Sequence, residues 1–103
     1  MLPVIYKLDK ERVLKLGFKA VAKLEKIFDC PMSKWDTPNF SFDHIANVLA
    51  ESLRHEMPDI DKEKVEDLID EYSDISTAFK KTYECIGAAF GKNLEAVEAP
   101  PQK

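Results

Sequence analysis

The chain has 103 residues, of which 45% are hydrophobic and 33% charged, and its formal net charge is -4. This length and composition fit one small domain with a single core, and no apolar run approaches the roughly 20 residues of a membrane-spanning helix. Residues 1–12 also lack the charged leader and long apolar stretch of a signal peptide, so we expect a cytoplasmic protein without a membrane partner.

A β-hairpin is the first predicted element, over residues 4–16, with its turn at residues 9–11. Apolar residues stand at alternate positions, which is the period of a strand with one buried face. The predicted inward side chains are Val4, Tyr6, Leu8, Leu14 and Leu16. Because a two-stranded hairpin is weak in water by itself, it must pack against the helices that follow.

A single helix over residues 10–28, capped by Asp9, is a second interpretation of the same segment. Its apolar face would include Val13 and Val21. This helix would carry Gly17 in its middle, at a cost of about 1 kcal/mol relative to alanine. The sequence favours the hairpin but leaves both interpretations open.

Four helices are predicted after the hairpin, at residues 18–29, 42–56, 62–72 and 75–90. Pro31 ends the first, because proline cannot continue a helix and constrains the residue before it. Ser41, Asp61 and Asp74 stand where an N-cap side chain would accept a hydrogen bond from the first turn of each later helix.

The second predicted helix carries a regular apolar stripe of Phe42, Ile45, Ala46, Leu49 and Leu53. Similar stripes in the last two helices include Ile69, Tyr72, Ile75 and Phe79. We therefore predict a mainly α fold of the α+β class, a small N-terminal β-hairpin packed on a bundle of about four helices. Residues 1–93 would form the single globular domain and residues 94–103 a disordered tail.

Charge is divided unevenly along the chain. Residues 1–34 hold eight Lys or Arg against four Asp or Glu, whereas residues 56–74 hold two against nine. Opposite patches on one small domain suit head-to-tail self-association or a charged partner, and a solvated surface is the alternative. Nucleic-acid binding is disfavoured because the basic segment lacks interleaved aromatic residues and the pI is near 5.2.

No pattern in the sequence predicts a metal site. Residues 59–63 resemble the start of a calcium-binding loop, but Lys64 replaces the required glycine and Asp70 the required bidentate glutamate. His44 and His55 are 11 residues apart, too far along a helix to share one ion.

Catalytic chemistry is equally unsupported by the sequence. Glycine-rich phosphate loops and nucleophile elbows are absent from it, and Cys30 and Cys85 form no CxxC pair. In a cytoplasmic chain these two cysteines should stay reduced. We expect no catalytic residue, no bound cofactor and no metal.

Protein binding is the remaining class of function. Four large apolar residues lie in or beside loops, where they either cover the core or meet a partner: Met32, Trp35, Phe40 and Met57. Trp35 is the best candidate for an anchor, because aromatic residues dominate the energetics of interfaces. Grooves between amphipathic helices could also receive a helix of the partner.

Four segments carry a resemblance to a known family: RVLKLGF (12–18), AVAKLEKIFDCP (20–31), ANVLAESLRHE (46–56) and DKEKVEDLIDEY (61–72). Together with Pro58 before the last of them, their order and punctuation resemble the small tail assembly chaperones of long-tailed phages and gene transfer agents. The resemblance spans about residues 4–92 and is a pattern of helices, not a set of functional residues.

The resemblance implies a non-enzymatic chaperone that binds the tape measure protein and supports assembly of the tail tube. The partners it implies are the tape measure protein, the tail tube protein and further copies of the chain. Such a chaperone would act in the cytoplasm of the bacterial host and be absent from the mature virion. The alternatives are a small head–tail connector or completion protein, and an adaptor that binds a host protein.

Overall fold

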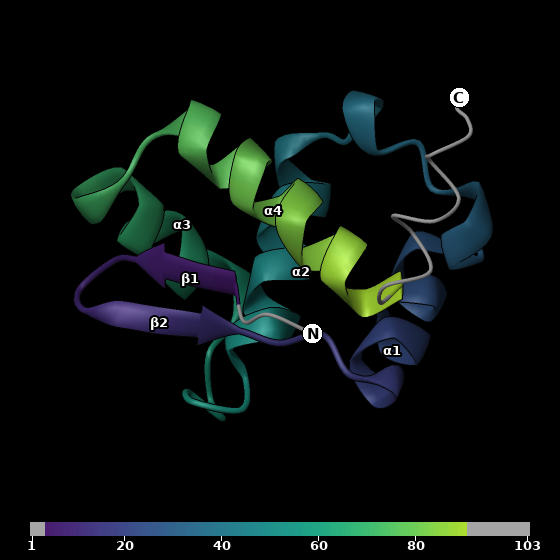
Figure 1. The fold of residues 1–103 in the computed structure, drawn as a ribbon, viewed down its shortest axis with the longest axis horizontal. Helices are drawn as coiled ribbons and strands as arrows, with labels where there is room; N and C mark the ends of the chain where they lie inside the picture. Colours follow the sequence, from purple (N-terminus) through teal and green to yellow (C-terminus); the bar gives the residue numbers. More distant parts are fainter. Residues whose placement is uncertain (1–3, 91–103) are drawn as a thin grey trace.

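The structure is a computed structural model that describes residues 4–90, and the predicted tail at 94–103 lies outside this part. Its elements, in order, are β1 (Val4–Lys7), β2 (Glu11–Leu14), α1 (Phe18–Phe28), α2 (Phe42–Leu53), α3 (Lys62–Tyr72) and α4 (Ile75–Phe90), with short 3-10 turns at Met32–Lys34 and Thr37–Asn39 between α1 and α2. The predicted fold class, mainly helical with an N-terminal hairpin, is confirmed (Figure 1).

The hairpin pairs β1 and β2 antiparallel, with Val4 opposite Leu14 and Tyr6 opposite Arg12. Its predicted inward residues are buried except Leu16, which is half-buried at the exit from β2. Gly17 is extended and forms the N-cap of α1, so the alternative of one helix over residues 10–28 is wrong. The alternating pattern prevails because it gives the strands a buried face against the helices.

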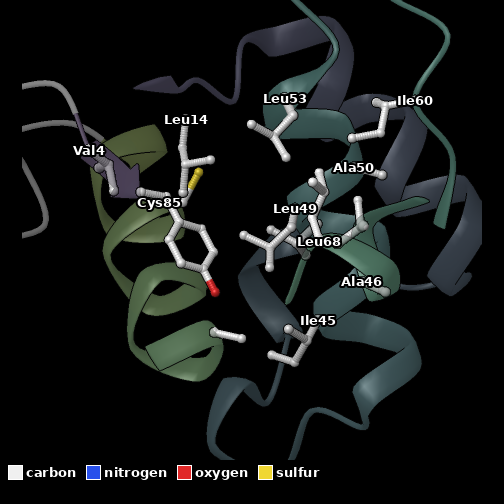
Figure 2. Close-up of a cluster of buried hydrophobic side chains, with 14 of the residues drawn as sticks. Val4, Leu14, Ile45, Ala46, Leu49, Ala50, Leu53, Ile60, Leu68 and Cys85 are labelled. Atoms are coloured by element: carbon white, nitrogen blue, oxygen red, sulfur yellow. The ribbon is translucent and has the colours of Figure 1, made fainter. Parts of the chain in front are cut away.

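Helix α2 is the centre of the molecule. It contacts α1, α3, α4 and β2, and every residue from Ile45 to Leu53 except Asn47 is buried. Figure 2 shows Leu49 and Leu53 of α2 pointing toward Leu14 and Cys85, which come from β2 and α4. The sequence predicted a single apolar stripe here, but the structure surrounds α2 almost completely.

Three features of α2 fit this central position. Ala46 and Ala50 have short side chains that let neighbouring elements approach α2 closely. The buried Ser52 hydroxyl has a hydrogen-bond partner within the helix, because it donates to the Leu49 carbonyl at 2.8 Å. Phe42, the first residue of the predicted stripe, lies beyond the covered part and is 63% exposed.

The predicted helix starts are confirmed. Ser41 accepts a hydrogen bond from the His44 amide, and the His44 ring accepts one from the Ser41 amide in return. Asp61 and Asp74 accept from the amides three residues later, at 2.9 and 2.7 Å. Helix α2 ends three residues before its predicted end at 56, because residues 54–56 form a turn.

Side chains from the turn that follows α2 hold the hairpin in place. The free edge of β2 is satisfied at Val13, whose amide donates to Glu56 and whose carbonyl lies 2.7 Å from the His55 ring nitrogen. The buried Arg12 guanidinium donates to Asp9 in the turn and to Glu56. These bonds cover an edge that would otherwise be open to pairing with another strand.

Glu51 is a charged residue held inside the bundle, with its side chain only 7% exposed. Burial works to raise the pKa of its carboxyl group, but hydrogen bonds from Arg54 and Lys23 outweigh it, and the pKa lies below its ordinary value. The carboxylate therefore stays ionised and ties α1 to α2 through Lys23 at 3.1 Å.

We predict that Glu51→Gln lowers the free energy of unfolding at pH 7 by about 1–2 kcal/mol, because charged hydrogen bonds become weaker neutral ones. A carboxylate whose folded pKa is lowered stabilises the fold above its ordinary pKa, here 4.5, and this contribution vanishes as pH falls through the folded value. Urea denaturation between pH 7 and 3 should show the free energies of unfolding of the unaltered protein and of Glu51→Gln converging as the pH falls. Glu11→Gln, at an exposed position, is the matched control, and a difference that is independent of pH would contradict the prediction.

The two cysteines differ in their surroundings. Cys85 is buried beside Ser52, and burial raises the pKa of its thiol to about 12. Cys30 is half-buried at the end of α1, where its thiol donates weakly to the Pro31 carbonyl.

We predict that one thiol of the folded protein reacts quickly with Ellman's reagent and the second only after unfolding, because the thiolate is the reactive form. Cys30→Ser should remove the fast phase and leave a protein that reacts only in denaturant. Rapid labelling of both cysteines without denaturant would show that Cys85 is not protected as the structure describes.

Candidate functional site

A groove lies where the starts of α2 and α4 meet the second half of α3. It encloses about 280 Å³ and is lined by Phe42, Ile45, Ala46, Glu66, Ile69, Asp70, Ile75, Ala78 and Phe79. The Asp74 cap starts α4 immediately after α3 ends at Tyr72. This tight connection brings the first turn of α4 beside α3 and places Ile75 over the groove.

The groove floor is apolar and partly open to solvent. Phe42 and Ile75 are 63% and 59% exposed, each at the first position of its helix. The rings of Phe42 and Phe79 meet edge to face, with centroids 6.0 Å apart. Large apolar side chains that gather in a hollow while remaining exposed indicate a surface for a partner.

The rim of the groove is acidic. Glu66 and Asp70 are one helical turn apart on α3, and both are exposed. Within residues 4–90, neither carboxylate lies within salt-bridge distance of a Lys, Arg or His side chain. Nearby, Asp43 of α2 is already paired with Lys62, which joins the starts of α2 and α3. The negative charge at the rim is therefore carried by Glu66 and Asp70, neither of which is in a salt bridge with a described residue.

This arrangement suits recognition of another protein. An apolar floor accepts the apolar face of a helix, and carboxylates at its edge favour a partner whose flanking side chains are basic. Among residues 4–90, no three His, Cys, Asp or Glu side chains gather as metal ligands. The described helices also include none that is long and apolar enough to cross a membrane.

The loop residues predicted to bind a partner lie elsewhere. Phe40 is buried, and its ring and that of Trp35 pack with Phe28 of α1 at centroid distances of 5.8 and 5.2 Å. The Trp35 indole also donates to the Cys30 carbonyl at 2.9 Å. Phe40 therefore has little surface to offer a partner, because it holds the loop between α1 and α2 against the core.

The other residues predicted to bind a partner, Met32, Trp35 and Met57, are half-buried and so remain partly exposed. Met32 and Trp35 line a second hollow of about 260 Å³ together with Tyr83 and Ile86 of α4. Met57 is half-buried and packs against the core after α2. The described residues that line this hollow include no acidic side chain, unlike those of the first groove. Partner binding by Met32, Trp35 and Met57 stays a prediction.

Sequence reasoning assigned Phe42 and Ile75 to core-facing stripes and missed their exposure. One signal was available: both are large apolar residues placed directly after an N-cap residue, Ser41 and Asp74. The first turn of a helix projects from the bundle end, where fewer neighbours can cover it. From the sequence, Glu66 was only one member of the acidic segment 56–74, and Asp70 was considered besides that only as a poor match to a calcium-binding loop.

Comparisons with protein-family models, with curated proteins and with solved structures gave no significant match.

We predict that the groove can be altered without unfolding the protein. Ile75→Ser should change the free energy of unfolding by less than about 1 kcal/mol, because the side chain is mostly exposed. Leu49→Ala, in the fully buried centre of α2, should cost about 2–5 kcal/mol through the cavity it leaves. Urea denaturation measures both, and a larger loss for Ile75→Ser would mean that the groove belongs to the core.

Proposed function

We propose that this protein is a non-enzymatic tail assembly chaperone that binds the tape measure protein of a long-tailed phage or gene transfer agent. One structural observation supports a binding role: an apolar groove with an acidic rim that stays open to solvent at the starts of α2 and α4. The tail-assembly context comes from the resemblance of residues 4–92 to that family.

The groove would receive side chains from the apolar face of one amphipathic helix of the client. Phe42, Ile75 and Phe79 would contact its apolar face, and Glu66 and Asp70 would pair with lysine or arginine side chains beside that face. A tape measure protein is long and helical and exposes such faces before the tail tube encloses it. Many copies of a small binder could then cover it along its length.

Each contact of this kind is small. A hollow of about 280 Å³ holds a few side chains and not a whole helix, so a single site should bind weakly and release readily. Weak binding repeated along one client gives high occupancy by avidity. It also permits the chaperone to leave when tube subunits take its place.

We predict that co-expression with the tape measure protein of the same genome keeps that protein soluble and that the two co-purify. Ile75→Glu should abolish both effects, because it puts a third carboxylate beside Glu66 and Asp70 and removes apolar surface. Glutamate is well tolerated at the first position of a helix, so the variant should fold.

Ile27→Glu is the matched control, since Ile27 is also a half-exposed isoleucine but lies on α1. It should behave as the unaltered protein. An insoluble tape measure protein, or one that elutes alone, would contradict the chaperone role. Recovery of the chain from purified particles would instead favour the connector alternative, and capture of a host protein alone would favour the adaptor.

A further inference from the structure

One continuous row of side chains on α4 joins the groove to the second hollow. Its residues stand four apart along the helix: Ile75, Phe79, Tyr83 and Gly87. Residues with this spacing follow one another as a ridge on the helix surface. The first two line the groove and the last two line the second hollow. Because Ile75 and Tyr83 are 59% and 42% exposed, this α4 ridge is open to solvent at both hollows.

The second hollow is similar in size to the groove and is also largely apolar. It encloses about 260 Å³, against about 280 Å³ for the groove. Met32 and Trp35 line it from the segment between α1 and α2, and Gly87 leaves the backbone of α4 open to close approach. Figure 1 shows the start of α4 beside α3 and its end beside the segment that joins α1 to α2. The ridge therefore runs from one hollow to the other.

The spacing of the two hollows matches the repeat of a helix. The two ridge residues of the second hollow follow those of the groove by eight residues each, which is about 12 Å along the helix axis. In a partner helix that lies along the ridge, side chains seven or eight residues apart share a face and are separated by about the same distance. One helix can therefore place an apolar side chain in each hollow at once.

The charges at the two hollows differ. Glu66 and Asp70 stand at the rim of the groove, whereas the described residues that line the second hollow include no acidic side chain. Lys80 is exposed and one helical turn from Tyr83, where it would repel a basic side chain. A partner helix with basic side chains at one end only is therefore favoured in one direction, with that end at the groove.

We propose that the α4 ridge binds one amphipathic client helix of about twelve residues, with one apolar anchor in the groove and a second, seven or eight residues away, in the second hollow. This inference rests on the proposed function and names the pattern that its client must carry. Apolar residues would stand at i, i+4 and i+7 or i+8, with lysine or arginine beside the first of them only. Trp35 would contact the second anchor.

Fluorescence of Trp35 tests the far end of this contact, because it is the only tryptophan of the chain and lines the second hollow. The probe is a synthetic helix of about 16 residues without tryptophan, with leucine at i, i+4 and i+7 and two lysines beside the first leucine. Its binding should shift the Trp35 emission to shorter wavelength, because the ring loses contact with water. Moving the third leucine to the opposite face of the peptide should weaken binding at least about tenfold and remove the shift.

Two substitutions test the protein side of the contact. Ile75→Glu alters the groove and Tyr83→Ser alters the second hollow, and each should weaken binding of the same peptide at least about tenfold while circular dichroism shows unchanged folding. The matched controls are Ile27→Glu on α1 and Tyr72→Ser at the end of α3. Both control residues are 47% exposed and line neither hollow, so these variants should bind like the unaltered chain.

Several results would overturn the proposal. They are a peptide that does not bind at about 1 mM, binding that leaves the Trp35 emission unchanged, and binding that Tyr83→Ser does not weaken. A Trp35 emission that shifts with protein concentration alone would also overturn it, because a second copy would then fill the ridge.

Co-expression separates this proposal from the proposed function. If Tyr83→Ser keeps the tape measure protein soluble as well as the unaltered chain does, and Ile75→Glu does not, the client uses the groove alone. The ridge proposal then fails and the chaperone role stands. If the peptide binds along the ridge but the tape measure protein stays insoluble with the unaltered chain, the chaperone role fails and the ridge remains a surface that binds helices.

Discussion

The burial of α2 on almost all sides from Ile45 to Leu53 is the constraint on which the rest of the structure depends. Short helices are marginal in water, and α1 and α3 have 11 residues each, so both must bury an apolar face to be stable. Helix α2 supplies that surface to α1, α3, α4 and the hairpin at once. Because it is covered along Ile45–Leu53, only its first turn projects beyond its neighbours. The groove at Phe42 is open because the packing around α2 stops before this first turn.

The hairpin shows how polar side chains complete a core of this size. Tyr6 is buried, and its hydroxyl meets the Ser73 hydroxyl at 2.8 Å, so β1 is tied to the junction between α3 and α4. Burial raises the pKa of the Tyr6 hydroxyl, which keeps it neutral and able to donate. On the other strand, Glu56 and His55 satisfy the edge of β2. Two short strands thus become a covering layer that is held from both sides, which a lone hairpin cannot achieve.

The sequence predicted the elements well because their signals are local. Alternation identifies β1 and β2, and Ser41, Asp61 and Asp74 identify the helix starts through bonds made within one turn. Whether a helix face is buried cannot be predicted in this way, because it depends on which elements from distant parts of the chain pack against that face. The periodic pattern placed both Phe42 and Leu49 on the buried stripe of the helix. In the structure Phe42 is 63% exposed, whereas Leu49 is fully buried. It also could not reveal that Glu51 would be enclosed, since its partner Lys23 comes from another helix. The groove combines side chains of three helices, so a local pattern could mark Phe42 or Ile75 as exposed but could not reveal the groove itself.

Folding turns the division of charge along the chain into a division in space. The basic N-terminal segment contributes α1 and the acidic segment contributes α3, and these helices occupy opposite ends of the molecule (Figure 1). Each end also carries exposed apolar surface, at Phe18 and at the groove. Electrostatic attraction acts over a distance of about 10 Å and orients an approaching partner, whereas apolar contact acts only once surfaces touch. A molecule that combines charge and exposed apolar surface at both ends favours a contact that is made in one orientation.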